Sequence, residues 1–188
     1  ELEIREERKK RDIKPRFFSI DTLAGEFPAK TNYLYATYWG SHNDIKPLGE
    51  RGVIVLGSGP YRIGSSVEFD WSCVSVAGRL KKYGKKSIIV NCNPETVSTD
   101  YDMSDRLYFE ELTFERVTDI YEFESPLAII LSVGGQTPNN LSMRLNNYGA
   151  KILGTRAKDI DSAEDRNKFS DLLDRLGILQ PQWKSFSN

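Results

Sequence analysis

The fold is decided by the stretch VIVLGSGPYRIG, residues 53–64. Four consecutive apolar residues run directly into a glycine-rich turn, which is typical of a buried parallel strand followed by a tight connection to a helix. That helix is expected over residues 67–83, with Gly84 at the position where left-handed C-caps occur. A strand, glycine loop and helix in this order indicate the α/β class.

The same alternation continues along the chain. Thr113 is placed to cap one later helix, and another should end near Gly149. Asp161 and Glu164 have the spacing of a capping box, which predicts the start of a last helix that reaches Gly177. Strands that alternate with helices predict a flavodoxin- or Rossmann-like parallel sheet with helices on both faces. The further expected strands are residues 87–90, 107–109, 127–131 and a short one at 151–154.

The first 50 residues have a different composition. Residues 1–14 are highly charged and predict a solvated helix or a frayed end, stopped by Pro15. Residues 17–39 are rich in aromatic side chains and should be buried against other structure, whereas residues 40–52 are polar and predict a linker. We therefore expect three parts: an N-terminal segment (1–50), an α/β domain (51–160) and a C-terminal helix (161–188).

Composition limits the function. The 188 residues carry 26 basic and 27 acidic side chains, and a net charge of −1 argues against a general nucleic-acid or acidic-membrane surface. No apolar run is long enough to span a bilayer, and no signal-peptide pattern opens the chain. Cys73 and Cys92 lack C-x-x-C spacing, which favours reduced thiols, and a single histidine, His42, argues against a zinc site or a Ser-His-Asp triad. The absence of an initial Met suggests a piece of a longer protein.

The glycine loop has the setting of a phosphate-binding turn but not its residues. After Gly57 and Gly59, the third glycine, Gly64, comes two residues too late for the dinucleotide fingerprint. A Walker loop requires lysine where Ser65 stands. What remains is a set of backbone N–H groups, a helix N-terminus and Arg62, all favourable to a small anion. A tight connection that binds no ligand is the alternative.

A second polar loop follows the strand at 87–90 and reads NCNPETVSTDYD, residues 91–102. Ligands in open α/β sheets bind at the carboxyl ends of strands, and neighbouring strand ends lie about 5 Å apart. Glu68 and Glu95 follow two different strands, so both carboxylates could face one cavity with Arg62. A capping box between Ser65 and Glu68 would explain Glu68 equally well.

Residues 57–70 and 91–102 together resemble the synthetase portion, or large subunit, of carbamoyl-phosphate synthetase. Further matches are residues 104–110, 134–140 and 163–166, and the resemblance covers residues 17 to 186. Residues 20–27 resemble the motif that closes the segment between the two halves of that subunit, which points to the second half. The resemblance implies that residues 1–50 end a connecting segment of oligomerisation type, that residues 51–160 form the pre-ATP-grasp domain, and that residues 161–188 form the first helix leading into an ATP-grasp domain. The family usually has a triplet such as Cys-Ala-Ala where this chain has Leu23-Ala24-Gly25. Residues 32–35, 69–71 and 139–140 look more like the eukaryotic fused, pyrimidine-pathway form.

The resemblance implies an ATP-dependent ligase. Its first half phosphorylates bicarbonate and captures it with ammonia from glutamine; the carbamate then passes through a tunnel to the second half, where a second ATP phosphorylates it. ATP and Mg²⁺ (or Mn²⁺) would bind outside this chain, which holds no metal site and should be inactive alone. The implied partners are the remaining synthetase domains and a glutaminase domain or subunit, without nucleic acid or membrane. The implied location is cytoplasmic, or mitochondrial for a urea- or arginine-pathway form.

By motif position, Arg62, Glu68 and Glu95 resemble residues that line the carbamate tunnel near its exit. We expect seven further residues to shape the surrounding loops: Gly57, Gly59, Gly64, Asn93, Gly134, Gly135 and Gln136.

Three other functions remain open at this point. A non-catalytic Rossmann-like module that binds a nucleotide or anion is disfavoured by the glycine spacing, and by Asn91 and Asn93 where an acidic ribose partner would stand. A scaffold fragment is favoured by the aromatic segment 17–39. A related ATP-grasp carboxylase should lack the loop at residues 91–102.

Overall fold

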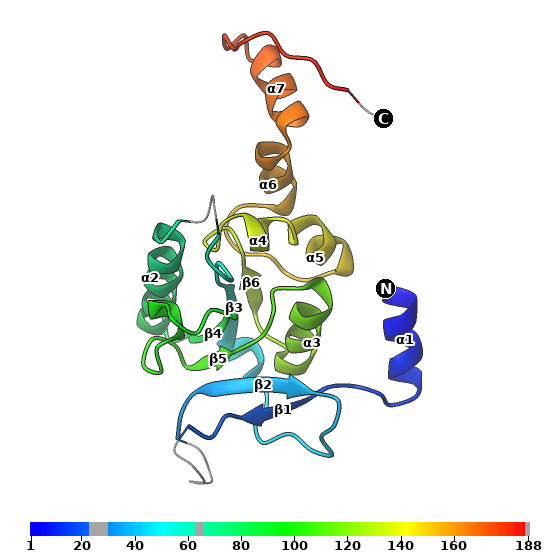
Figure 1. Ribbon diagram of the computed structural model, residues 1–188, viewed down its shortest axis with the longest axis vertical. Helices are drawn as coiled ribbons and strands as arrows, with labels where there is room; N and C mark the ends of the chain where they lie inside the picture. The colour runs from blue at the N-terminus through cyan, green and yellow to red at the C-terminus, as the bar shows by residue number, and fades with distance from the viewer. Residues whose placement is uncertain (23–29, 63–65, 187–188) are drawn as a thin grey trace.

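A computed structural model describes residues 1–22, 30–62 and 66–186 (Figure 1). These residues form a six-stranded sheet in the order β1-β2-β5-β4-β3-β6. The edge strand β1 runs antiparallel to β2, and all other neighbours are parallel. The strands are β1 (Arg16–Ser19), β2 (Tyr33–Thr37), β3 (Gly52–Leu56), β4 (Lys86–Val90), β5 (Arg106–Tyr108) and β6 (Ala128–Ile130).

The strand order identifies the topology. Counted from β3 along the chain, the four strands β5-β4-β3-β6 stand in the order third, second, first, fourth. This is the Rossmann order and not that of flavodoxin, so the structure decides between the two folds that the sequence left open. The direction of the chain across the sheet reverses between β3 and β6, and the switch point where ligands bind in such sheets therefore lies at their carboxyl ends.

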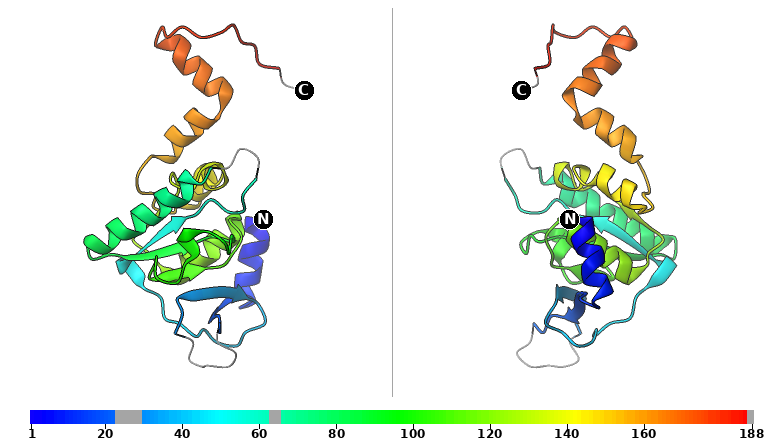
Figure 2. Two further views of the ribbon diagram at one scale, coloured as in Figure 1. Left: turned by 60° about the vertical axis from the view of Figure 1, so that its left-hand side comes forward. Right: turned by 90° about the vertical axis from the view of Figure 1, so that its right-hand side faces the viewer.

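Helices cover both faces of the sheet, as predicted (Figure 2). α2 packs on one face, and α3 lies with α4 and α5 on the other. α6 and α7 extend away from the sheet, and α7 has no buried residue (Figure 1). The helices are α1 (Leu2–Lys10), α2 (Glu68–Lys82), α3 (Phe114–Glu124), α4 (Gln136–Asn139), α5 (Ser142–Tyr148), α6 (Ala157–Glu164) and α7 (Arg166–Arg175), with short 3₁₀ turns η1 (Gly49–Arg51) and η2 (Val97–Thr99).

The core forms on the two faces of β3 and β4, and every residue of β3 is buried. Val55 and Ile89 face α2, where they pack with Cys73 and Ala77. The larger cluster on the opposite face joins the sheet to α3 and α5 and includes Ile54, Leu56, Ile88, Val90, Val117, Ile120, Leu141 and Leu145. Continuous apolar runs therefore do form strands buried on both sides, as the sequence predicted.

The N-terminal segment is part of this fold. The predicted solvated helix is present as α1, whose only buried residue is Arg5, but it is attached to α3: Arg5 is only 6% exposed and pairs with Asp119 and Glu122. The predicted burial of the aromatic segment is right for Phe17, which is buried in β1 and stacks on Phe123 with 4.3 Å between ring centroids, but Tyr35, Tyr38 and Trp39 are exposed. β1 and β2 extend the parallel sheet by an antiparallel edge that the sequence did not predict.

Residues 40–52 are not a free linker. Asn43 Oδ1 accepts the backbone N–H of Phe17 at 2.8 Å, and Asp44 Oδ2 accepts that of Ser19 at 3.1 Å. The N–H of Asp44 returns a bond to the Phe17 carbonyl at 2.9 Å. The outer edge of β1 is thereby paired by a loop of the same chain.

Some of the helix ends predicted from capping residues agree with the structure, and others do not. Thr113 caps α3 by accepting from the N–H of Arg116, and Gly84 and Gly149 have positive φ angles of 68° and 95°. The capping box predicted at residues 161–164 is wrong, because both residues lie inside α6 and the side chain of Asp165 instead caps α7. The predicted strand at 151–154 is reduced to one bridge between Ile152 and Ile129.

A fully buried carboxylate ties three segments together. Glu124, at the end of α3, accepts hydrogen bonds from the Tyr108 hydroxyl, the Arg106 guanidinium and the Leu48 N–H. Burial, reinforced by the Glu124 carboxylate, raises the pKa of Tyr108 well above its ordinary value. Tyr108 therefore stays a neutral donor, and the segment before β3 is fixed to the core.

Replacing Glu124 by Ala should lower the free energy of unfolding by about 3–5 kcal/mol, because Arg106 is left without its buried counter-charge. Urea denaturation followed by circular dichroism measures this. Glu111→Ala, at an exposed position, should change it by less than about 0.5 kcal/mol. Equal losses in the two variants would contradict the role of Glu124.

Candidate functional site

The candidate site lies at the carboxyl ends of β3, β4 and β6, where three loops touch. A methyl group added at Gly134 would lie 2.5 Å from the carbonyl oxygens of Leu56 and Gly57. The loop after β6 thus passes against the backbone that leaves β3, at a distance that only glycine permits.

The buried side chain of Asn91 organises the loops after β3 and β4. Its Oδ1 accepts the N–H groups of Gly59 and Asn93, both at 3.2 Å, and its Nδ2 lies 3.2 Å from Ser98 Oγ. The Asn91 amide also fills the space beside Gly57, where an added methyl group would meet Nδ2 at 2.7 Å. Sequence reasoning used Asn91 only against a ribose site and missed this role.

α2 holds the second loop from the other side. Both carboxylate oxygens of Asp70 accept the N–H of Ser98 at 3.2 Å, and Asp70 is buried. Tyr61 and Thr96 join the two loops by a 2.8 Å hydrogen bond between their hydroxyls. A pocket of about 460 Å³ lies beside these two loops and α2, and Glu95 forms part of its wall. The other lining residues are Tyr61, Val67, Asp70, Trp71, Val74, Thr96, Val97 and Asp100.

Arg62 reaches across the switch point. Its Nη2 donates to Thr137 Oγ1 in α4 at 3.1 Å, which links the loop after β3 to the helix after β6. α4 begins at Gln136, which is exposed, directly after Gly135. Gly135 has φ +76° and lies against Phe69, since an added methyl group would meet that ring at 2.7 Å. The guanidinium of Arg62 is exposed at the place where an open α/β sheet binds its ligand.

The structure does not bring the three predicted tunnel residues into contact. Glu68 is exposed as the first residue of α2, Glu95 lines the pocket and Arg62 turns towards α4. Within residues 1–22, 30–62 and 66–186, no ion pair or hydrogen bond joins any two of them. The predicted capping box pairs Glu68, here the first residue of α2, with Ser65, so it falls partly outside the described residues. Gly64 and Ser65 lie outside the described residues.

Two features of nucleotide and metal sites are missing from the described residues of the site. The loop after β3 has no lysine to reach a phosphate chain, and the described part of the chain contains no group of three His, Cys, Asp or Glu side chains able to hold a metal. Nor is any described helix long and apolar enough to cross a membrane. Of the two free thiols, Cys73 is buried, and burial raises its pKa to about 12; Cys92 is half-buried.

Comparison with known proteins identifies the family. The model of the carbamoyl phosphate synthase preATP-grasp domain matches residues 49–162. The arginine-specific large chain of mitochondrial carbamoyl phosphate synthase from Schizosaccharomyces pombe is 57% identical over 188 residues, which is 100% of this chain and 16% of that protein. The large chain from Pyrococcus furiosus is 56% identical over 98% of this chain and 18% of its own length. The mitochondrial carbamoyl-phosphate synthase [ammonia] of Rattus norvegicus is 56% identical over 98% of this chain and 12% of its own length.

The fold is therefore that of a Rossmann-like pre-ATP-grasp domain. The chain belongs to the carbamoyl phosphate synthase family, and the Rossmann-module alternative is set aside. It spans between 12% and 18% of the length of these three relatives.

The close approach at Gly134 can be tested with a matched pair of variants. Gly134→Ala should lower the free energy of unfolding by at least about 1–3 kcal/mol, because two backbone carbonyls must move. Gly78→Ala, in an open position within α2, should raise it by about 0.5–1 kcal/mol. Thermal and urea unfolding of both variants measure the difference. A Gly134→Ala protein as stable as the wild type would show that the loops do not meet as described.

Proposed function

We propose that this chain is the pre-ATP-grasp part of the second half of a carbamoyl-phosphate synthase large chain. The whole protein would form carbamoyl phosphate from bicarbonate and ammonia at the cost of ATP. One observation carries the proposal: more than half of the residues are identical to carbamoyl phosphate synthases over essentially the whole chain. Those identities span a segment that contains both polar loops at the switch point.

The chemistry of the loops suits a protected carbamate. Carbamate is unstable in water, so a conduit must exclude bulk solvent and replace hydration with fixed polar groups. Arg62 offers a planar cation able to hold a carboxylate-like anion, and Glu68 and Glu95 offer acceptors for the N–H and O–H groups of carbamic acid. In the whole protein, neighbouring domains would close the exposed side chains of Glu68 and Arg62 into a channel.

ATP and Mg²⁺ (or Mn²⁺) would bind to other domains of the same polypeptide, since the described part of this chain holds no group of three His, Cys, Asp or Glu side chains for a metal and the loop after β3 has no lysine for a phosphate chain. The remaining partner would be a glutaminase domain or subunit that supplies ammonia. The product would serve pyrimidine or arginine synthesis: residues 32–35 favour the fused pyrimidine-pathway form, whereas the S. pombe relative is named arginine-specific. The location of the whole protein would follow the pathway: cytoplasmic for a pyrimidine-pathway form, or mitochondrial for an arginine-pathway form.

Glu68→Gln in the complete enzyme should uncouple the two halves. The first ATP-consuming step should persist, while carbamoyl phosphate formed per ATP falls about tenfold or more, because a hydrogen bond to a charged group is worth about 1.5–3 kcal/mol. Parallel assays of ADP release and of carbamoyl phosphate, trapped as citrulline, measure the ratio.

Glu3→Gln is the matched control, because Glu3 is exposed on α1, far from the loops in sequence. A normal product ratio for Glu68→Gln would remove the tunnel role but leave the synthase assignment intact. A wild-type protein that forms no carbamoyl phosphate from bicarbonate, ATP and ammonia would contradict the assignment itself.

A further inference from the structure

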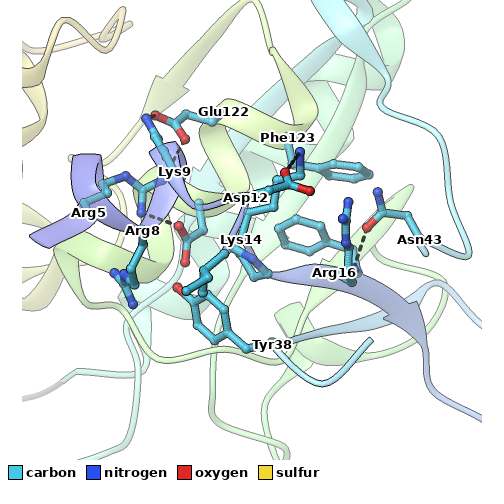
Figure 3. Close-up of a pocket in the computed structure, with 14 residues that line it drawn as sticks. Arg5, Arg8, Lys9, Asp12, Lys14, Arg16, Tyr38, Asn43, Glu122 and Phe123 are labelled. Carbon is cyan, nitrogen blue, oxygen red and sulfur yellow. Dashed lines mark hydrogen bonds and ion pairs between the residues drawn. The ribbon is translucent and has the colours of Figure 1, made fainter. Parts of the chain in front are cut away.

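A second cavity, of about 440 Å³, lies beneath α1 (Figure 3). α1 forms one wall, the segment from Asp12 to Phe17 forms another, and α3 closes the cavity with Phe123. The cavity lies by the β1–β2 hairpin and shares no lining residue with the pocket at the switch point. Five cationic side chains line it, against three carboxylates: Arg5, Arg8, Lys9, Lys14 and Arg16 against Asp12, Asp119 and Glu122.

At one end of the cavity, the cationic side chains of α1 form ion pairs with carboxylates of α3. Arg5 pairs with Asp119 and Glu122, and Lys9 also pairs with Glu122. Arg8 pairs with Glu115 on α3. These contacts attach α1 to α3, and an anion could enter this end only by breaking them.

At the other end, Arg16 has no close ion pair. Lys14 pairs with Asp12 at 2.6 Å, and Arg16 acts on the same carboxylate only from a longer distance, where its charge helps to lower the pKa of Asp12. No carboxylate in the described part of the chain lies within ion-pair distance of Arg16. Figure 3 shows Arg16 next to Asn43, away from the pairs around Arg5. Because Asn43 Oδ1 is fixed by the N–H of Phe17 at 2.8 Å, the amide NH₂ of Asn43 is left to donate on the cavity side.

The lining of the cavity combines apolar and polar groups. The half-buried ring of Phe123 gives the same cavity an apolar surface. An apolar wall with a few convergent polar groups, in a volume of about 300–1,000 Å³, is typical of sites for small organic molecules.

We propose that this cavity binds a small organic anion. Its anionic head pairs with the guanidinium of Arg16 and accepts from the amide of Asn43, and its apolar body lies on Phe123. An inorganic ion would satisfy the head group but leave most of the 440 Å³ and the aromatic surface uncovered. Lys14 neutralises Asp12, so no unpaired carboxylate opposes the ligand at this end.

Three probes distinguish the contribution of the ligand's anionic head group from that of its apolar body: phenyl phosphate, inorganic phosphate and benzyl alcohol. Titration of the ¹⁵N-labelled chain, followed by amide shifts, should show phenyl phosphate binding more tightly than either fragment. The shifts should centre on Arg16, Asn43 and Phe123. Binding of inorganic phosphate as tightly as phenyl phosphate, or shifts confined to other surfaces, would overturn the proposal.

Two variants remove the head-group contacts by different means. Arg16→Gln should weaken phenyl phosphate about tenfold, as expected for the loss of about 1.4 kcal/mol. Asn43→Asp keeps the acceptor for the Phe17 N–H but sets a negative charge before the ligand, so binding should be lost while the fold is kept. Arg79→Gln, on the exposed side of α2, is the control and should bind as the wild type does. Wild-type affinity in both Arg16→Gln and Asn43→Asp would overturn the proposal.

Discussion

The carboxyl edge of the sheet depends on the buried amide of Asn91. Loop backbone groups that leave a sheet lose their ladder partners and must be paired by other means. Asn91 pairs two such N–H groups, in two different loops, and positions Ser98 for its bond with α2. The positions of Arg62 and Glu95 follow from this arrangement, because each lies within four residues of a group that Asn91 holds. An apolar residue of the same size would fill the space but leave the donors unpaired.

Polar contacts also attach the N-terminal segment. α1 buries only Arg5, and ion pairs with α3 take the place of apolar packing. Asp119 shows the balance of forces: burial raises its pKa even though the Arg5 guanidinium acts to lower it. Glu124 then fixes the approach to β3 through Leu48. The sheet and its N-terminal extension are thus joined by charges whose desolvation must be offset by good geometry.

Sequence reasoning found what short-range patterns encode. Continuous apolar runs located β3, β4 and β6, and the rule for strand ends directed attention to residues 57–62 and 91–102. Contacts between residues far apart in sequence were out of reach, such as the pairing of Arg5 with Asp119, 114 positions away. β1 and β2 were missed because four and five residues with mixed burial give no clear alternation. The start of α7 was misplaced because the spacing of Asp161 and Glu164 matches a capping box, whereas the actual N-cap is Asp165, four residues after Asp161. Spacing alone does not show which of the two aspartates caps the helix.

The pairing of β1 with its own loop has a consequence beyond the fold. An open sheet edge offers a row of hydrogen-bonding groups on which a second chain can add a strand, and such additions can continue into fibres. Here the outward N–H groups of Phe17 and Ser19 are occupied by side chains of residues 43 and 44. At the opposite edge, Ile129 is met by the segment around Ile152. Segments of the same chain therefore meet both edge strands of the described sheet, which leaves fewer backbone groups open to strand addition.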